Sequence, residues 1–437
     1  MSISPRKRLL LWIAAVPVLA ALLAYGLYSI PFIHDRMAWR VDELRTRLVY
    51  AINPPEEALF VPEQQEELAT VVQQTLEALT PDATSTPAAS TPQPVTPTPT
   101  MEPLPPAVTL EGVKYENQHN RWHYCGPANL SMALTYWGWD GDRDVVGAYV
   151  KPSDKDKNVL PSEMEEFVRT QTPYSMLIRQ GGTIELLQRM LAAGFPVLVE
   201  KGYYEVDYTG TLGWLGHYQF VTGYDEGIDS LLVQDTYIEG GKDHLTTYDE
   251  FLEGWISFNY LFMVVYPPEQ EPAVLEALGP WADPDWAAQH ALETALAETQ
   301  SETGLNEFFA WFNQGTSHVA LRQYVDAAFA YDQAFVTYAS LQQDDVMRPY
   351  RIMWYQTGPF WAYYYSGRYS DVINLANTTL LETISEPVLE ESFYWRGLAH
   401  EGLGNMDQAI SDWQTALQLH PDWDPATYQL IRVGAWD

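Results

Sequence analysis

The stretch that most strongly constrains the fold is Cys-Gly-Pro-Ala-Asn-Leu-Ser at residues 125–131, which contains the only cysteine among 437 residues. Proline is favoured at the first position of a helix, and apolar residues follow at helical spacing, so we expect a helix to begin here. A thiol at a helix start faces unpaired backbone N–H groups and the positive end of the helix dipole, and both favour the thiolate. Cys125 is therefore a candidate nucleophile, with a small buried hydrophobic residue as the alternative.

The composition limits the functional classes that fit this chain. It has 24 basic and 58 acidic residues, a net charge of −34, which repels a phosphate backbone and argues against nucleic-acid binding. The length predicts two or three domains, and a hydrophobic content of 46% is enough for sizeable cores. A single cysteine cannot form an intramolecular disulfide, so cysteine usage does not indicate the redox compartment.

Residues 111–267 form the segment in which helical patterns are followed by strand patterns. Helices first and strands afterwards predict a segregated α+β domain. The expected helices cover residues 128–137, 161–169 and 184–193, and the expected strands cover residues 196–200, 217–223, 230–235 and 260–266.

A thiol nucleophile needs a base, and the base needs an acceptor that orients it. Among nine histidines, His217 is the best candidate because it stands at the start of an expected strand, directly after Gly216. The next expected strand ends in Asp235 after an intervening turn. A hairpin of these two strands would bring the imidazole and the carboxylate together.

Three motifs in this order resemble the C39-like branch of the papain-fold cysteine peptidases: CGPA at Cys125, GHYQFVTGYD around His217 and VQDT around Asp235. The resemblance covers about 155 residues and implies a papain-like α+β cysteine peptidase domain. It implies Cys125 as the nucleophile, His217 as general base and acid, and Asp235 as the residue that orients His217. A catalytically inactive copy of the fold that binds a partner is the alternative.

The resemblance also implies a glutamine a few residues before the cysteine, whose amide would help to stabilise an oxyanion. Gln118 has the right residue type but lies seven positions upstream, so Asn120 remains a rival. His119 and His123 are four residues apart, a spacing that presents two ligands to one ion only on a helix, and this segment precedes the expected helix. We expect no metal and no other cofactor.

The N-terminal region predicts a membrane anchor. Residues 9–30 carry no charge and would span about 33 Å as a helix at about 1.5 Å per residue, which is enough to cross a bilayer core. A short basic segment precedes this run, as in a signal anchor, so residues 1–34 are expected to be a cytoplasmic tip and a transmembrane helix. Residues 35–79 are expected to form a charged helical juxtamembrane segment.

Residues 80–110 are the predicted stalk. Nine prolines and seven threonines lie between Thr80 and Pro106, a composition that cannot bury a core and forms an extended spacer. A spacer of this kind can hold domains away from a membrane, so we expect the C-terminal domains to be extracytoplasmic. A plain interdomain linker is the alternative.

The C-terminal part predicts an all-α solenoid. Gly315 and Tyr331 recur at the same spacing as Gly397 and Trp413, a pattern that resembles tetratricopeptide (TPR) repeats, in which small residues allow two helices to pack closely. Residues 268–302 are expected to form a connecting helix, and residues 303–437 to form repeats that start near 308, 353 and 390. The resemblance implies a protein partner, and the alternative is an array that only braces the preceding domain.

These features together predict a single-pass bacterial membrane protein. Its expected activity is the hydrolysis of a peptide or related amide bond through a thioester acyl-enzyme. A peptide or protein substrate and a protein partner of the repeats are the expected ligands.

Overall fold

The computed structural model describes residues 59–62 and 103–436, except 122, 154–155, 157, 207–211, 342–347, 350 and 382–388, together with short pieces between residues 19 and 48. Most of the predicted anchor, residues 9–30, lies outside the described residues, as do residues 63–102 of the predicted juxtamembrane segment and stalk. Within the described part, none of the helices has both the length and the apolar character needed to span a bilayer.

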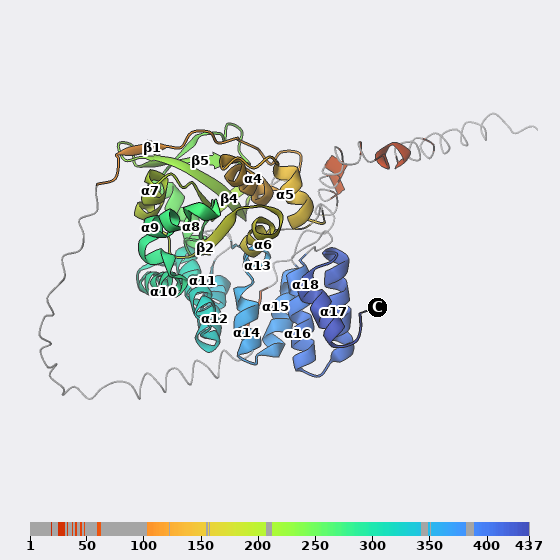
Figure 1. The fold of residues 1–437 in the computed structure, drawn as a ribbon. Helices are drawn as coiled ribbons and strands as arrows, with labels where there is room; N and C mark the ends of the chain where they lie inside the picture. The colour runs from red at the N-terminus through yellow and green to blue at the C-terminus, as the bar shows by residue number, and fades with distance from the viewer. Residues whose placement is uncertain are drawn as a thin grey trace, which may run out of the picture.

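A seven-stranded antiparallel sheet forms the centre of the first domain (Figure 1). Six strands lie in the order β2-β7-β3-β4-β5-β6, and β1 pairs with β4 beside this path. The strands are β1 (Ala107–Thr109), β2 (Ser175–Arg179), β3 (Val197–Val206), β4 (Leu212–Asp225), β5 (Ser230–Asp235), β6 (His244–Thr247) and β7 (Phe262–Tyr266).

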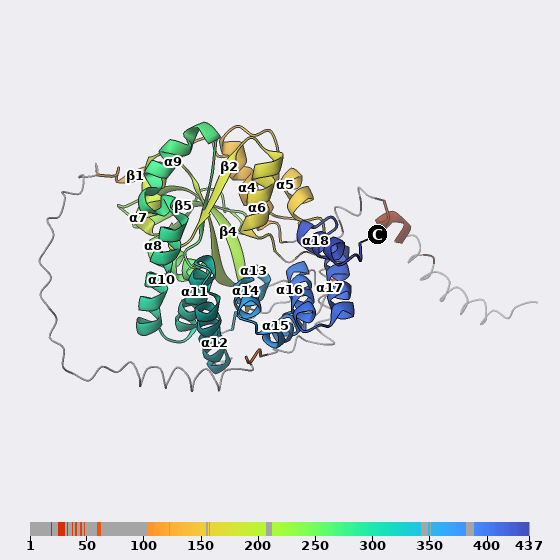
Figure 2. The same ribbon diagram turned by 60° about the horizontal axis from the view of Figure 1, so that its bottom comes forward.

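Helices cover both faces of the sheet because its strands are apolar on both sides (Figure 2). Leu198 and Phe220 pack in one core with α4 (Cys125–Tyr136) and α6 (Pro161–Gln171), whereas Val197 and Val221 pack in a second core with α7 (Ile184–Ala192) and α8 (Tyr248–Trp255). A further helix, α5 (Arg143–Val150), packs against α4.

The domain is a mixed α/β domain, although helices and strands are less segregated along the chain than the sequence pattern predicts. Strand β1 precedes α4, and β2 lies between α6 and α7. Both strands are short, with three and five residues, and their few residues are too few for a period to be recognised in the sequence.

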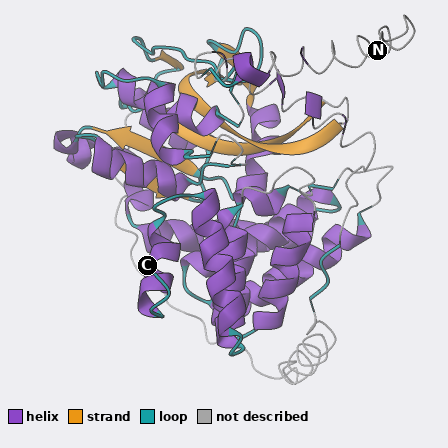
Figure 3. Ribbon diagram, turned by 90° about the vertical axis from the view of Figure 1, so that its right-hand side faces the viewer, coloured by secondary structure: helices purple, strands orange, loops and turns teal. Residues whose placement is uncertain are grey.

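The described residues of the C-terminal region form helices and no strand, as predicted, and Figure 3 shows these helices gathered on one side of the strand-containing domain. Residues 268–302 form two α-helices and two short 3-10 helices, η2 (Pro268–Gln270) and η3 (Gly279–Ala282), not one connecting helix. The helices are α9 (Glu271–Leu278), α10 (Pro284–Ser301), α11 (Leu305–Ala320), α12 (Tyr324–Ser340), α13 (Ile352–Tyr355), α14 (Gly358–Tyr365), α15 (Tyr369–Leu381), α16 (Glu390–Gly402), α17 (Met406–Leu419) and α18 (Asp424–Arg432).

The glycine and aromatic residues that recur in the sequence are contact points between paired helices. A Cβ added to Gly315 on α11 would come within 2.7 Å of the Tyr331 ring on α12. A Cβ added to Gly397 on α16 would come within 2.6 Å of Trp413 on α17. Glycine is therefore required at both positions because only its backbone allows an aromatic ring to approach so closely.

The middle repeat, which lacks this pair, is held by a buried ion cluster. Arg368 donates to Asp332 from both terminal nitrogens, at 2.7 and 3.0 Å, and to Asp371 from Nε at 2.7 Å. Tyr363 donates to the same Asp332 carboxylate at 2.9 Å. These bonds join α12 to α14 and α15, and the single positive charge of Arg368 offsets part of the charge of the two buried carboxylates.

The two domains share one hydrophobic core and several buried hydrogen bonds. The short 3-10 helix η1 (Ile256–Phe258) lies against α11, and its Phe258 ring contacts the Tyr355 ring of α13 with centroids 6.0 Å apart. Asn313 of α11 donates to the Ile256 carbonyl at 2.7 Å, and Gln356, directly after α13, donates to the Ser257 carbonyl at 2.7 Å. The helical array therefore contacts the first domain through a formed interface.

Candidate active site

The candidate nucleophile begins α4. The first intrahelical bond runs from the Ala128 N–H to the Tyr124 carbonyl at 3.0 Å, so Cys125 is the first helical residue. Pro127 is the third helical residue, and the expectation that it is the first is wrong by two positions. Proline is tolerated there for the same reason, since N–H groups in the first turn have no intrahelical acceptor.

The first turn of α4 packs against the part of β4 that extends beyond the end of β5. Strand β5 ends at Asp235, opposite Gln219 of β4, so β4 continues beyond its neighbour. Buried Asn129 of α4 donates to the carbonyl of Tyr218, at 2.9 Å, and to the Cys125 carbonyl at 2.9 Å. The Asn129 side chain therefore links the first turn of α4 to β4, next to the residue at which the pairing of β4 with β5 ends.

The structure brings His217 and Asp235 together, although His217 does not stand at the mouth of a strand as the sequence pattern predicts. Strand β4 begins at Leu212, five residues earlier, and pairs with β3 over its whole first half. His217 Nε2 lies 3.1 Å from Asp235 Oδ1, so Nδ1 is the ring nitrogen left to face Cys125.

Asp235 is fixed by three further donors. Gln219 donates from Nε2 to Oδ2 at 2.6 Å, and the main-chain N–H groups of Tyr237 and Ile238 donate to Oδ1 at 2.8 and 3.3 Å. Because β4 and β5 are in register at this pair, Gln219 and Asp235 lie on the same face of the sheet. The carboxylate is thereby held in one orientation towards His217.

The electrostatics of the three side chains favour a thiolate and an imidazolium. Burial alone would raise the pKa of Cys125, but the hydrogen bond and charge of His217 outweigh burial and leave this pKa below its usual value. Burial alone would lower the pKa of His217, but the Asp235 carboxylate and the thiol raise it to about 10. The pKa of Asp235 is lowered because His217 outweighs the effect of burial.

Gln118 fits an oxyanion donor better than Asn120. The Gln118 main-chain N–H donates to the Thr236 carbonyl at 2.9 Å, and its Oε1 accepts from Thr236 Oγ1 at 2.8 Å. With its oxygen engaged, the amide presents its NH₂ group as the donor. Asn120 is exposed and lies in a turn with a φ of 65°, so its side chain is not held by a comparable contact with Thr236.

Sequence reasoning missed two residues beside the thiol. Glu200 of β3 is 2% exposed, faces Tyr218 across the strand pair, and lies close enough to Cys125 for the thiolate charge to raise the pKa of Glu200. Burial first, and then the charge of Cys125, raise the pKa of Glu200 well above its usual value and favour the protonated form of this acid. No local sequence pattern marks it.

The second missed residue, Tyr355, comes from the helical array. A Cβ added to Gly216 would lie 2.8 Å from its ring, one residue before His217. Burial raises the pKa of Tyr355 well above its usual value, with a contribution from Cys125. Residue 355 lies 230 positions after the cysteine, so only the tertiary structure could reveal this contact.

The rival metal site at His119 and His123 has no support among the described residues, where neither histidine belongs to a group of three potential ligands. His119 Nε2 lies 2.7 Å from the Tyr237 carbonyl. This contact gives His119 a structural role next to the loop that also holds Asp235.

Comparisons with known proteins agree with this description. Residues 110–263 match the model of the Peptidase_C39 like family, and residues 390–423 match a tetratricopeptide repeat model. The chain thus contains a C39-like peptidase domain followed by a TPR repeat. No significant match was found among curated proteins.

A solved structure from Bacillus anthracis, described as a C39-like peptidase, is similar to this chain at 16% sequence identity. The match covers 37% of this chain and 97% of that chain, with a TM-score of 0.30. At that TM-score the similarity supports no further conclusion.

Proposed function

We propose that this chain is a cysteine peptidase that hydrolyses a peptide or related amide bond through a thioester. The observation that carries the proposal is the arrangement of a helix-start thiol, a buried imidazole and a buried carboxylate held by three further donors. A structural cysteine would need none of these partners. The lowered pKa of Cys125 and the raised pKa of His217 have the directions that a nucleophile and its acid–base partner need.

In the acylation step, the Cys125 thiolate attacks the substrate carbonyl carbon and the carbonyl electron pair moves onto oxygen. The Cys125 main-chain N–H, which has no intrahelical acceptor, and the Gln118 amide would donate to that oxyanion. One such donor contributes about 3–4 kcal/mol in related acyl-transfer enzymes. The His217 imidazolium then gives its proton to the leaving nitrogen, and the C–N bond breaks.

In the deacylation step, neutral His217 takes a proton from water, whose oxygen attacks the thioester. Collapse of the second tetrahedral species breaks the C–S bond and restores the thiolate and the imidazolium. Asp235 remains a carboxylate throughout, since its lowered pKa keeps it ionised while it orients the ring and stabilises the imidazolium.

The proposal includes attachment to a bacterial cytoplasmic membrane. Residues 9–30 would form the single span, and residues 80–110 would hold the peptidase domain and the array on the extracytoplasmic side. Protease protection in sealed vesicles tests this topology. In sealed vesicles whose cytoplasmic face is outward, the protease should cleave the stalk only after the vesicles are opened. Cleavage of the stalk in intact vesicles of this orientation would contradict the proposed topology.

The array has a second proposed role, the binding of an apolar peptide. Phe60, from the chain's own N-terminal part, is 6% exposed and packs between α12 and α14. Its ring centroid lies 4.8 Å from Phe335 and 5.9 Å from Tyr363. The contact between Phe60 and these two rings favours a binding site between α12 and α14 for an aromatic side chain of a peptide.

Full-chain protein and a peptide library test the enzymatic proposal. New peptide termini, read by mass spectrometry, are expected with the wild type and with a His244→Ala control, whose histidine lies on β6. They are expected to be absent with Cys125→Ala, and reduced at least about a hundredfold with His217→Ala, because general acid–base catalysis contributes about 10²–10⁴-fold. Equal cleavage by the wild type and Cys125→Ala would refute the proposal.

A further inference from the structure

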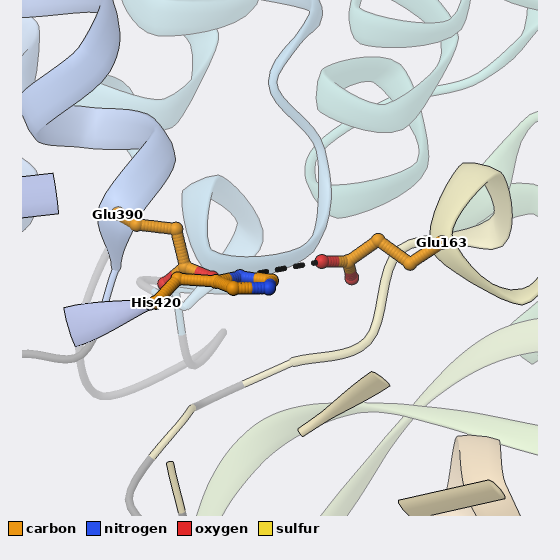
Figure 4. A group of neighbouring side chains, drawn as sticks. All are labelled: Glu163, Glu390 and His420. Carbon is orange, nitrogen blue, oxygen red and sulfur yellow. Dashed lines mark hydrogen bonds and ion pairs between the residues drawn. The ribbon is translucent and has the colours of Figure 1, made fainter. Parts of the chain in front are cut away.

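A second cluster of titratable side chains lies outside the candidate active site, where the C39-like domain meets the last repeat. Glu163 belongs to the first turn of α6, Glu390 is the first residue of α16, and His420 directly follows α17. Figure 4 shows these three side chains converging from the two domains. The peptidase chemistry uses none of them.

The geometry of this interdomain cluster resembles a set of metal ligands. One potential ligand atom from each residue lies within 4.8 Å of the others. His420 Nδ1 lies 2.7 Å from Glu390 Oε1 and 4.0 Å from Glu163 Oε1. The His420 ring stacks on Trp423 at 5.8 Å between centroids, which limits the orientations of the imidazole.

The carboxylates are also constrained. Glu163 Oε2 accepts the Leu160 main-chain N–H at 2.7 Å, so the second oxygen of Glu163 points towards His420. Glu390 is 2% exposed, and its Oε2 has no hydrogen-bond partner among the residues that the structure describes. An unpartnered carboxylate oxygen in such a buried position is unfavourable unless a ligand completes it.

The acidic side chains of the cluster also favour a bound cation. Glu163 comes from α6 of the C39-like domain and Glu390 from α16 of the array, and their side chains are 16% and 2% exposed. Acidic groups of two domains therefore meet at one buried place. A cation bound there would offset their repulsion and hold the domains together.

We propose that Glu163, Glu390 and His420 bind one Zn²⁺ ion, which fastens α6 of the C39-like domain to α16 and α17 of the array. Zinc takes histidine nitrogen and carboxylate oxygen at about 2.0–2.2 Å in tetrahedral geometry, so two ligand atoms lie about 3.3–3.6 Å apart. The separations of 2.7 and 4.0 Å fall on either side of that distance, and small side-chain rotations would equalise them.

The ligand types favour zinc over the common hard cations. Ca²⁺ takes six to eight oxygen ligands and Mg²⁺ requires near-octahedral oxygen, whereas this cluster offers one imidazole and two carboxylates. Water would complete the fourth position. The site would therefore strengthen the interface that places Tyr355 beside the candidate active site, without requiring that Cys125 be catalytic.

Zinc binding is tested on full-chain protein that has been stripped with a chelator and titrated with zinc chloride. One zinc per chain and a higher melting temperature are expected for the wild type. Glu390→Gln and His420→Gln should each weaken binding by about a hundredfold or more, since even loss of an outer-shell group costs about 10–100-fold. His400→Gln, a change on α16 away from the cluster, serves as the matched control and should bind like the wild type.

X-ray absorption of the zinc-loaded wild type gives a readout that does not depend on the folding of a variant. A shell of nitrogen and oxygen with one imidazole is expected. A sulfur shell would assign the ion to Cys125, and two imidazoles would assign it to another pair of histidines, so either spectrum would overturn the proposal. Equal affinity in the wild type and both variants, or stabilisation by low pH but not by zinc, would overturn it as well.

Discussion

Replacing His217 with glutamine should distinguish a thiolate–imidazolium pair from an ordinary buried thiol. Glutamine keeps a similar volume and can form hydrogen bonds, but it carries no positive charge. In the wild type, burial is outweighed by Asp235 and Cys125, and the pKa of His217 rises to about 10. The difference between about 10 and the ordinary 6.5 corresponds to about 5 kcal/mol in favour of the imidazolium, at about 1.4 kcal/mol per pKa unit.

The substitution removes the group that offsets burial at the thiol. The pKa of Cys125 should then exceed about 8.5, so that only about 3% or less of the thiol is ionised at pH 7. The alkylation rate at pH 7 falls by a smaller factor than the thiolate population, because a thiolate of higher pKa is more nucleophilic, with a Brønsted coefficient of about 0.4–0.5. The midpoint of the pH profile is therefore the decisive quantity.

The assay is the rate of iodoacetamide alkylation of the single cysteine between pH 4 and pH 11. The wild type should reach its plateau at a pH below the usual thiol pKa and change again near pH 10, where His217 loses its proton. The His217→Gln midpoint should lie above the ordinary thiol pKa of about 8.5, and therefore above the wild-type midpoint, whereas a His244→Gln control should match the wild type. Midpoints that agree within about half a unit in all three proteins would refute the ion pair.

Four further predictions concern single residues. Glu200→Gln should leave the alkylation midpoint unchanged within about 0.3 pH units, because burial raises the pKa of Glu200 and favours its uncharged form; a large shift would show that Glu200 is charged. Asn129→Leu removes hydrogen bonds to the main chains of α4 and β4, and it should lower the free energy of unfolding, measured in urea, by about 1–3 kcal/mol. Gly216→Ala adds a methyl group in the contact with α13 and should lower the free energy of unfolding by about 1–3 kcal/mol, which a lower melting temperature would show. Arg368→Met leaves two buried aspartates without their cation and should lower the free energy of unfolding, measured in urea, by about 3–5 kcal/mol. An unchanged urea midpoint would show that the cluster is solvated.

Local patterns in the sequence predict elements whose residues lie close together in the chain. The helix that begins at Cys125, the strand that ends at Asp235 and the small–aromatic pairs of the array all follow from spacing and residue type over a few turns or one strand. Short strands are different. Strand β1 has three residues, too few to show a period, and it forms because β4 offers an edge.

The extent of β4 also shows where sequence patterns fail. The residues before His217 include two glycines and do not look like a strand, yet they pair with β3 because an adjacent strand supplies hydrogen bonds over their whole length. Gly216 is compatible with this strand because its missing Cβ leaves room for Tyr355 and Phe258.

The sequence by itself determined the identity and order of the three candidate catalytic residues, since a helix start and two strand positions carry local signatures. Only the tertiary structure decided that a buried acid, Glu200, and a tyrosine of the array, Tyr355, lie near them, and that Glu163, Glu390 and His420 form a separate cluster between the domains. These groups come from elements that are far apart in the chain. Their proximity depends on how β3, α6 and the repeats pack, and burial in that packing sets their charges.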